Sequence, residues 1–161
     1  MYRPILATLG FILSSDKKSV LLVHRNKRAD DEHLGKYNGL GGKMEIDEDA
    51  LACLKREIKE EAGIGCREIE LRGTVSWPGF GKNGEDWFGF IFLVRSYEGE
   101  PEMTNEEGDL HWKLISELGT LPMWEGDQYF LSMIFDDNPA PFHGHMPYAE
   151  GVPLSWSYSR G

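Results

Sequence analysis

The chain has few cysteines, no excess of basic residues and no long hydrophobic run among its 161 residues. Its two cysteines, Cys53 and Cys66, show neither the paired spacing of a zinc site nor the density of a disulfide-stabilised secreted domain. The apolar run Ile5–Leu13 is too short to span a bilayer, and the N-terminus lacks the basic region and cleavage site of a secretory signal. We therefore expect a cytoplasmic protein that does not enter a membrane.

Acidic residues outnumber basic ones, since 17 Lys and Arg stand against 27 Asp and Glu, for a formal net charge of -10. A surface this acidic repels the phosphate backbone of duplex nucleic acid, which we do not expect as a partner. Carboxylates can instead recruit divalent cations, and these can hold a small phosphate ester. The charge thus favours a small phosphorylated ligand.

The length suits one domain with a hydrophobic core, and no repeat or linker divides the chain. We expect a single domain over residues 1–161, present as a monomer or a homodimer. Hydrophobic patterning predicts strands at Ile5–Leu13 and at residues 19–24, 70–77, 87–97 and 110–114, helices at 48–62 and 127–135, and loops at 27–36, 78–86 and 98–109. This mixture of strands and helices predicts an α/β layered sandwich.

The helix expected at residues 48–62 has the clearest boundaries. Asp47 is the candidate N-cap, with acidic residues in the first turn, and Gly63 is the candidate C′ residue. Spacings of three and four residues predict a buried apolar stripe of Leu51, Leu54, Ile58 and Ala62.

The same helix carries Glu57, Glu60 and Glu61, which project within roughly 100° of one another. Like charges at these spacings destabilise a helix by roughly 0.2–0.5 kcal/mol per pair unless a cation lies between them. Carboxylate oxygens suit Mg²⁺, with Mn²⁺ as a possible substitute. The alternative is a solvated helix face, in which the glutamates pair with neighbouring Lys and Arg residues.

The surroundings of these glutamates form a longer motif. Gly42 is followed after five residues by Glu48, and after seven more by the run Arg56, Glu57, Ile58, Lys59, Glu60, Glu61, Ala62, Gly63 and Ile64. This pattern resembles the Nudix box at every specified position and is far more specific than a lone glycine motif. The resemblance implies an α/β/α sandwich with a mixed β-sheet. It also implies Mg²⁺-dependent hydrolysis of a nucleoside diphosphate linked to another moiety.

Site roles also follow from this resemblance. Arg56 would orient a catalytic carboxylate, and Glu48 would stabilise the start of the helix. Glu57 is the first choice for the general base, with Glu60 and Glu61 as the other candidates. The resemblance implies metal ligands at Glu57, Glu60, Glu61 and the main-chain carbonyl of Gly41, with a further ligand at Glu107, for which Glu106 is a rival.

Further segments resemble the MutT-type 8-oxo-dGTP diphosphatases, including the oxidised-purine triphosphatases of animals. They are residues 37–43, the pair Trp112 and Trp124, Met123 beside Trp124, and residues 142–144. The resemblance implies that Asn38 hydrogen-bonds the base, Trp124 stacks on it and Asp127 reads its polar edge. The remaining expected substrate contacts are Thr8, Arg25, Leu40 and Lys43.

One departure concerns the residues after Trp124. Where the animal enzymes have two adjacent acids, this chain has Gly126 followed by Asp127. Only one carboxylate remains, so activity on oxidised adenine does not follow from the resemblance.

Three functions remain open. The first is hydrolysis of 8-oxo-dGTP or a related purine nucleoside triphosphate to the monophosphate and pyrophosphate, which would cleanse the nucleotide pool and support DNA repair. The second keeps the chemistry but changes the substrate to ADP-ribose, a dinucleoside polyphosphate or a capped RNA end, accommodated by the loop at 78–86. The third is a nucleotide-sensing module without catalysis. Whether attack falls on the α or the β phosphorus is also left open.

Overall fold

The computed structural model describes residues 1–31 and 33–161. The strands are β1 (Ile5–Leu13), β2 (Ser19–Arg25), β3 (Tyr37–Asn38), β4 (Gly65–Trp77), β5 (Trp87–Glu98), β6 (Gly108–Leu114), β7 (Phe142–His145), β8 (Tyr148–Ala149), β9 (Val152–Pro153) and β10 (Ser157–Arg160). The α-helices are α1 (Ala50–Ala62) and α2 (Leu131–Phe135), and the 3₁₀-helices are η1 (Ile115–Thr120) and η2 (Glu125–Tyr129). The loop expected at 27–36 is confirmed apart from Glu32, which lies outside the described residues.

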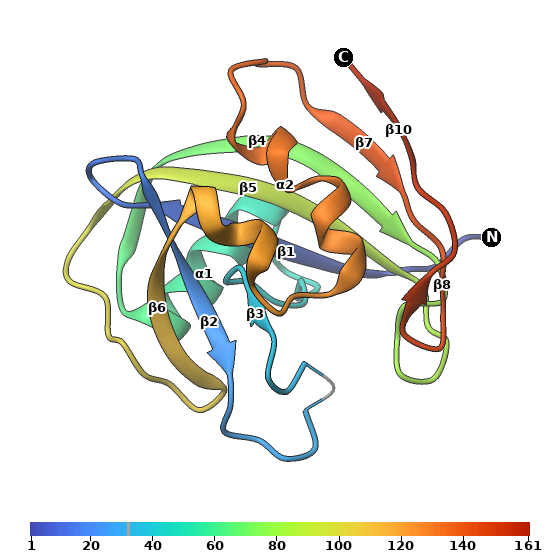
Figure 1. Ribbon diagram of the computed structural model, residues 1–161, viewed down its shortest axis with the longest axis horizontal. Coiled ribbons are helices and arrows are strands. Elements are labelled where there is room, and N and C mark those ends of the chain that lie inside the picture. The colour runs from blue at the N-terminus through green and yellow to red at the C-terminus, as the bar shows by residue number, and fades with distance from the viewer. Residues whose placement is uncertain (32) are drawn as a thin grey trace.

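In the described part of the chain, one mixed sheet contains eight strands in the order β10-β7-β4-β5-β1-β2-β3, with β6 paired to β2. The pairs β1–β5 and β4–β7 are parallel, whereas β1–β2, β4–β5 and β2–β6 are antiparallel. Figure 1 shows α2 in front of this sheet and α1 behind it. The expected α/β/α sandwich with a mixed sheet is therefore confirmed.

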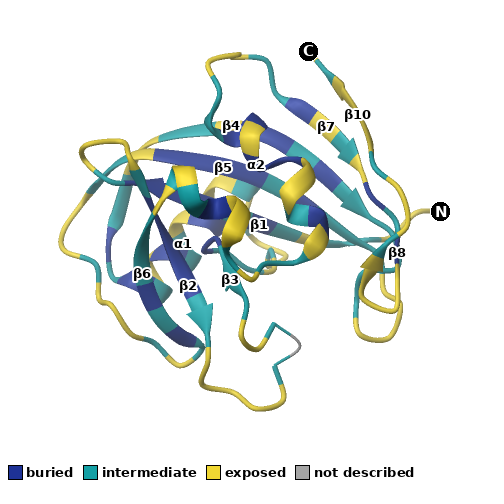
Figure 2. Cartoon of the chain, in the orientation of Figure 1, coloured by how far each residue is buried: buried dark blue, intermediate teal, exposed yellow. Residues whose placement is uncertain are grey.

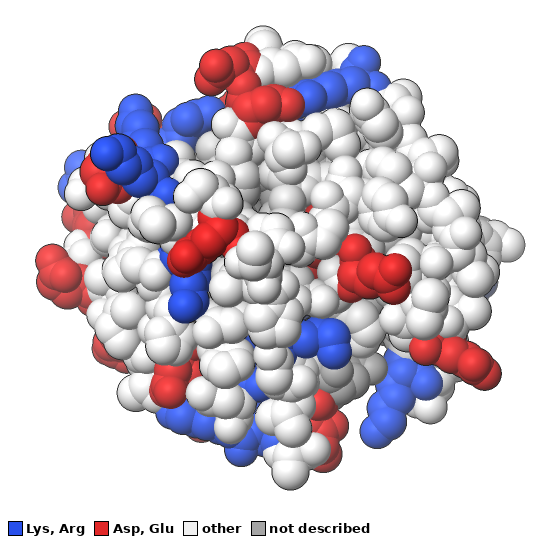
Figure 3. Space-filling view, in the orientation of Figure 1, with Lys and Arg blue, Asp and Glu red and all other residues white. Residues whose placement is uncertain are grey.

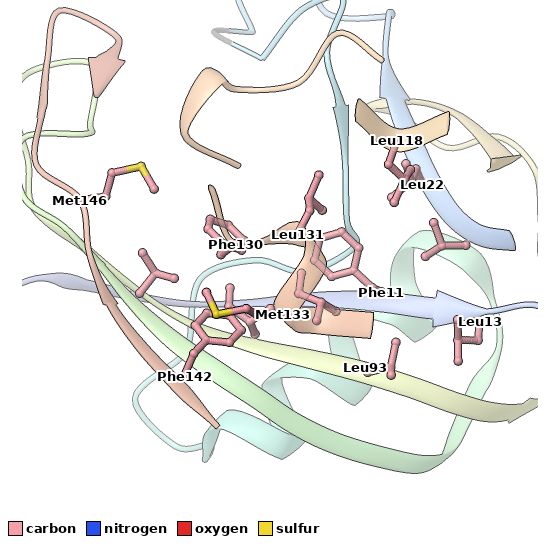
Figure 4. Close-up of a cluster of buried hydrophobic side chains, with 14 of the residues drawn as sticks. Phe11, Leu13, Leu22, Leu93, Leu118, Phe130, Leu131, Met133, Phe142 and Met146 are labelled. Carbon is pink, nitrogen blue, oxygen red and sulfur yellow. The ribbon is translucent and has the colours of Figure 1, made fainter. Parts of the chain in front are cut away.

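Two hydrophobic clusters lie on the two faces of the sheet because successive side chains of a strand point to opposite sides. On β1, Phe11 belongs to the cluster under α2, and its neighbour Ile12 belongs to the cluster under α1. Because both faces are covered, β1 and β2 carry unbroken runs of buried residues, and Figure 2 shows these central strands surrounded by exposed loops. The first cluster brings Phe130, Leu131 and Met133 against β1, β5 and β7 (Figure 4).

Helix α1 begins two residues later than expected. Its N-cap is Asp49, whose Oδ1 accepts a 2.8 Å hydrogen bond from Ala52 N. The predictions of Asp47 as the N-cap and of acidic residues in the first turn were therefore wrong. Gly63 ends the helix as expected, in the left-handed conformation at φ 71° that glycine adopts at little cost.

The buried stripe of α1 also differs at one position. Cys53 is buried with Leu54, Ile58 and Ala62, whereas Leu51 is 41% exposed and was wrongly assigned to the core. Cys53 rather than Leu51 contacts β1, since its Sγ lies 3.3 Å from Thr8 Oγ1.

The helix expected at 127–135 is instead split into η2 and α2. Phe130, at φ -118°, interrupts the helical path between them, and Gly126 contributes low helix propensity at the start. Strand β4 is longer than expected, since it starts at Gly65 and continues through register shifts against β5.

A buried arginine joins α2 to the sheet. Arg72 on β4 is 1% exposed and donates hydrogen bonds to the main-chain oxygens of Met133 (3.1 Å) and Ile134 (2.9 Å) at the end of α2. It also forms a 2.9 Å ion pair with Asp136. The unpaired carbonyls at the helix end are thus satisfied by a side chain from the strand beneath.

Candidate active site

The glycine-rich segment before α1 lies directly against β1. Gly10 and Leu40 exchange main-chain hydrogen bonds, and Thr8 N donates to Gly42 O at 2.9 Å. A Cβ atom on Gly42 would lie 2.6 Å from the carboxylate of Glu57, so only glycine leaves room for that side chain. The motif glycine therefore places main chain beside the carboxylates of α1.

Arg56 connects the start of the motif to its glutamates. Its guanidinium donates to both carboxylate oxygens of Glu48, at 2.6 and 2.9 Å, and to Glu57 Oε1 at 2.9 Å. It also donates to the main-chain oxygen of Lys43 at 3.2 Å. The hydrogen bonds from Arg56 lower the pKa of Glu48 to about 2. Arg56 thus holds Glu57 in one orientation while Glu48 holds Arg56.

Glu57 and Glu61 form the buried part of a carboxylate cluster. Burial raises the pKa of Glu57, and an opposing contribution comes from its hydrogen bond with Arg56. Burial raises the pKa of Glu61 well above its usual range, with further contributions from the negative charges of Glu107 and Glu57. Glu60 lies at the margin, with its side chain 60% exposed and 3.4 Å from Arg56.

Glu107, rather than Glu106, faces this cluster. Its carboxylate lies 3.3 Å from Arg25 and lines the same pocket as Glu57 and Gly41, whereas Glu106 is exposed. Asn105 shapes this turn, because its Oδ1 accepts hydrogen bonds from Glu107 N (2.8 Å) and Gly108 N (3.1 Å). Its Nδ2 donates to Glu61 O at 3.1 Å, which ties the turn to α1.

The donor set suits a hard divalent cation, although the side chains are not closed around one. Among the described residues, no three His, Cys, Asp or Glu side chains are already arranged to enclose a metal ion. Glu57 is instead held by Arg56. Within the same part of the chain, the buried Oε2 of Glu61 accepts no hydrogen bond. A cation beside Glu61 and Glu57 would satisfy that oxygen and offset the like charges.

An aromatic pocket opens beside this cluster. It is lined by Ala7, Thr8, Leu9, His33, Asn38, Trp77, Phe80, Trp87, Gly89, Trp124 and Asp127. A second pocket contains Arg25, Gly41, Gly42, Lys43, Glu57 and Glu107, and shares with the first Ala7, Thr8, Leu9, His33, Asn38 and Trp87. The aromatic pocket and the carboxylate cluster are therefore adjacent parts of one site.

Trp124 is held in this pocket by residues of the loop before β3. Its Nε1 donates a 2.6 Å hydrogen bond to His33 Nδ1, and Lys36 Nζ lies 4.6 Å from the centre of its ring. Burial lowers the pKa of His33 to about 4, with the nearby positive charge of Arg25 contributing, so the ring is neutral and can accept this bond. The ring of Phe80 lies edge-on to that of Trp124, and the two ring centroids are 4.9 Å apart.

Asp127 lies on η2 at the wall of the aromatic pocket. Burial raises the pKa of its carboxyl to about 7. The preceding Gly126 has no room for a side chain, because its Cβ would collide with Met146 and with the hydroxyl of Tyr148. Gly126 N donates to that hydroxyl at 3.2 Å. Tyr148 and Met146 thus fill the space beside Gly126, which leaves no room there for a second acidic side chain.

The other expected substrate contacts are distributed unevenly. Thr8 and Asn38 line both pockets, and Arg25 and Lys43 line the one that holds Glu57. Leu40 is fully buried between α1 and the sheet and is not among the residues that line either pocket. We therefore assign Leu40 to packing rather than to substrate contact.

Several residues of the site were missed in the sequence. Trp77, Phe80 and Trp87 form aromatic walls, His33 contacts Trp124, and Asn105 positions the turn before β6. The aromatic residues around the loop at 78–86 were visible as a cluster, but no local pattern indicated which of them face the site. His33 contacts Trp124, and the Nδ2 of Asn105 contacts Glu61, across long stretches of sequence, so neither contact could be found from a local pattern.

Comparison with known proteins agrees with this geometry. The sequence model of the NUDIX domain matches residues 4–133, and the chain therefore belongs to the Nudix hydrolase family. It is 31% identical over 141 residues to the uncharacterised Nudix hydrolase YvcI of Bacillus subtilis (strain 168), with 85% of this chain and 83% of the relative covered.

Other relatives lie in the MutT-like part of the family. The chain is 31% identical over 93 residues to the oxidized purine nucleoside triphosphate hydrolase of Danio rerio, a match that spans 58% of each protein. A crystal structure of a MutT protein from Bacillus halodurans has a TM-score of 0.83 at 29% identity, covering 96% of this chain and 97% of that one.

Within the described residues, none of the helices has the length and apolar character needed to cross a bilayer.

Proposed function

We propose that this protein hydrolyses an oxidised purine nucleoside triphosphate, 8-oxo-dGTP, to the monophosphate and pyrophosphate. The observation that carries the proposal is the shared wall between the aromatic pocket and the carboxylate cluster, formed in part by Thr8, Asn38 and Trp87. A base in the first pocket would extend its phosphates toward the second. The likeness to an oxidized purine nucleoside triphosphate hydrolase supports this substrate class.

The carboxylate cluster suits the phosphoanhydride chemistry. Glu57, Glu60, Glu61, Glu107 and the carbonyl of Gly41 would hold Mg²⁺, or Mn²⁺ in its place. When bound, such a cation neutralises phosphate charge and lowers the pKa of a coordinated water.

The chain's own residues then orient the reactants. Glu57 accepts the proton of the attacking water, and Arg56 keeps its carboxylate in place through the 2.9 Å hydrogen bond. Lys43 and Arg25, on the wall of the same pocket, attract the phosphates. Glu60, at the exposed margin, supplies a carboxylate that can turn inward.

The aromatic pocket suits a purine. The indole of Trp124 offers a flat π-face, although its N–H already donates to His33 and so does not read the base. Asn38 has a buried Nδ2 that finds no acceptor within the described chain. Asp127 can accept from a base N–H when ionised, and 8-oxoguanine carries such a donor at N7.

The biological role that fits this reaction is cleansing of the nucleotide pool, which supports DNA repair, in the cytoplasm. We assign the function to one domain over residues 1–161, acting as a monomer or a homodimer. Basic and acidic side chains are interspersed on the face shown in Figure 3, and the net charge of -10 favours a nucleotide over duplex nucleic acid.

The test is the release of pyrophosphate and phosphate from a panel of 8-oxo-dGTP, dGTP, 8-oxo-dGDP, ADP-ribose and a dinucleoside polyphosphate, with Mg²⁺ and with chelator. We expect metal-dependent pyrophosphate release with a preference for 8-oxo-dGTP, and loss of turnover in Glu57→Gln. Wild-type turnover by Glu57→Gln would contradict the mechanism. Preference for ADP-ribose or a dinucleoside polyphosphate would keep the chemistry and refute the substrate, and binding without any cleavage would indicate a sensing module.

A further inference from the structure

Trp87 occupies the first position of β5, at the edge of the aromatic pocket. On this strand Trp87, Gly89, Ile91 and Leu93 alternate with residues of the opposite face, and Ile91 and Leu93 belong to the hydrophobic cluster under α2. Trp87 therefore projects to the face that carries α2 and Trp124. Gly89 lacks a side chain at the next position on that face, and the Trp77 ring lies over it.

The indole N–H of Trp87 has no acceptor within the part of the chain that the structure describes, although its nitrogen is buried. Buried indole N–H groups usually find a hydrogen-bond partner, because leaving one unpaired costs free energy. Trp124 illustrates the usual case, since its N–H is satisfied by His33. The unpaired donor of Trp87 therefore calls for an explanation.

The position of Trp87 offers one. It lines both the aromatic pocket and the pocket that holds Glu57 and Lys43, so it lies where base and sugar would pass toward the phosphates. Lys43 Nζ lies 5.5 Å from the centre of the Trp87 ring, over its face. The N–H lies in the plane of the ring, so it does not point toward Lys43 Nζ above the ring face.

We propose that the Trp87 N–H is a specificity-determining hydrogen-bond donor to the nucleoside part of the substrate, meaning its base or sugar and not its phosphates. This inference rests on the proposed function, because it requires a purine nucleoside in the aromatic pocket. Trp87 then complements Asn38 as a second donor, while Trp124 provides stacking only.

The test separates the N–H from the ring. Incorporation of β-(3-benzothienyl)alanine at position 87 replaces the N–H with sulfur and keeps a bicyclic aromatic ring under Lys43. Binding is measured by calorimetry without metal, with two probes: the nucleoside 8-oxo-2′-deoxyguanosine, and pyrophosphate alone. We expect the nucleoside dissociation constant to rise about three- to tenfold, the loss of one neutral hydrogen bond, and the pyrophosphate value to stay unchanged.

Trp87→Phe serves as a second variant and should show the same selective loss for the nucleoside. Unchanged nucleoside affinity in the benzothienyl protein would overturn the inference, as would an equal loss for pyrophosphate. If the wild-type protein bound no purine nucleoside, the proposed function would fail and this inference with it. If the wild type bound the nucleoside and the variants bound it equally well, only the inference would fail.

Discussion

The buried carboxyl of Asp127 should make the stability of the ligand-free protein depend on pH in a way that Asp127→Asn removes. Burial raises its pKa from the ordinary 3.8 to about 7 in the folded protein. Below pH 3.8 the group is protonated in both the folded and the unfolded state. Between pH 3.8 and about 7 the folded state binds more protons, so the free energy of unfolding falls as the pH rises. Above about pH 7 that loss is complete.

The size of the effect follows from the two pKa values. They differ by about 3, and each pKa unit corresponds to about 1.4 kcal/mol, so the full loss is at most about 4 kcal/mol. The residue as a whole is only half-buried, and solvent beside it lowers the figure to roughly 2–3 kcal/mol. Asparagine is uncharged at every pH and has no such penalty.

The assay is urea unfolding of wild type and Asp127→Asn at pH 5 and pH 8 without nucleotide. We expect the stability of the variant relative to wild type to increase by roughly 1–2 kcal/mol between the two pH values, since part of the loss already occurs below pH 5. Asp137→Asn, which removes an exposed carboxylate outside the site, is the matched control and should show little change. If the free energies of unfolding of Asp127→Asn and wild type differed by the same amount at both pH values, the reasoning would be refuted.

Three further outcomes test other parts of the structure. Replacing Arg72 with Leu should lower the free energy of unfolding by about 2–5 kcal/mol, measured by urea unfolding, because the main-chain oxygens of Met133 and Ile134 lose their buried donor; a loss below about 1 kcal/mol would contradict this. Glu107→Gln should raise the Mg²⁺ concentration needed for half-maximal turnover, whereas Glu106→Gln should not, and equal effects would remove Glu107 from the metal site. His33→Phe should raise KM about two- to tenfold at unchanged kcat, with recovery in His33→Asn, because it removes the acceptor for the Trp124 N–H; a fall in kcat alone would argue against a positioning role.

The strongest sequence predictions concerned segments whose structure is set by neighbouring residues. The strand Ile5–Leu13 is confirmed to the residue, because an unbroken apolar run between Pro4 and a turn has few other solutions. The C-terminal end of α1 is likewise confirmed at Gly63, where a left-handed residue ends the helix. Its start was misplaced because Asp47 and Asp49 both suit an N-cap by residue type, and the structure uses Asp49.

The C-terminal region was harder to predict. The helix expected at 127–135 is two short helical segments, and strands β7 and β10 were not anticipated. Strands of four residues gain their stability from pairing with distant partners, here β7 with β4 and β10 with β7. Such pairing leaves little trace in a single short sequence.

By itself, then, the sequence determined the Nudix motif, the spacing of its glutamates and the helix that presents them, because all of these lie within one continuous segment, residues 42–64. Only the tertiary structure decided that Glu107 rather than Glu106 joins Glu57 and Glu61, since that choice depends on how Asn105 turns the chain against α1. The tertiary structure also brings Trp87 and Trp124 together around one pocket. These contacts link residues far apart in the chain, and their geometry is set by sheet pairing and packing rather than by local pattern.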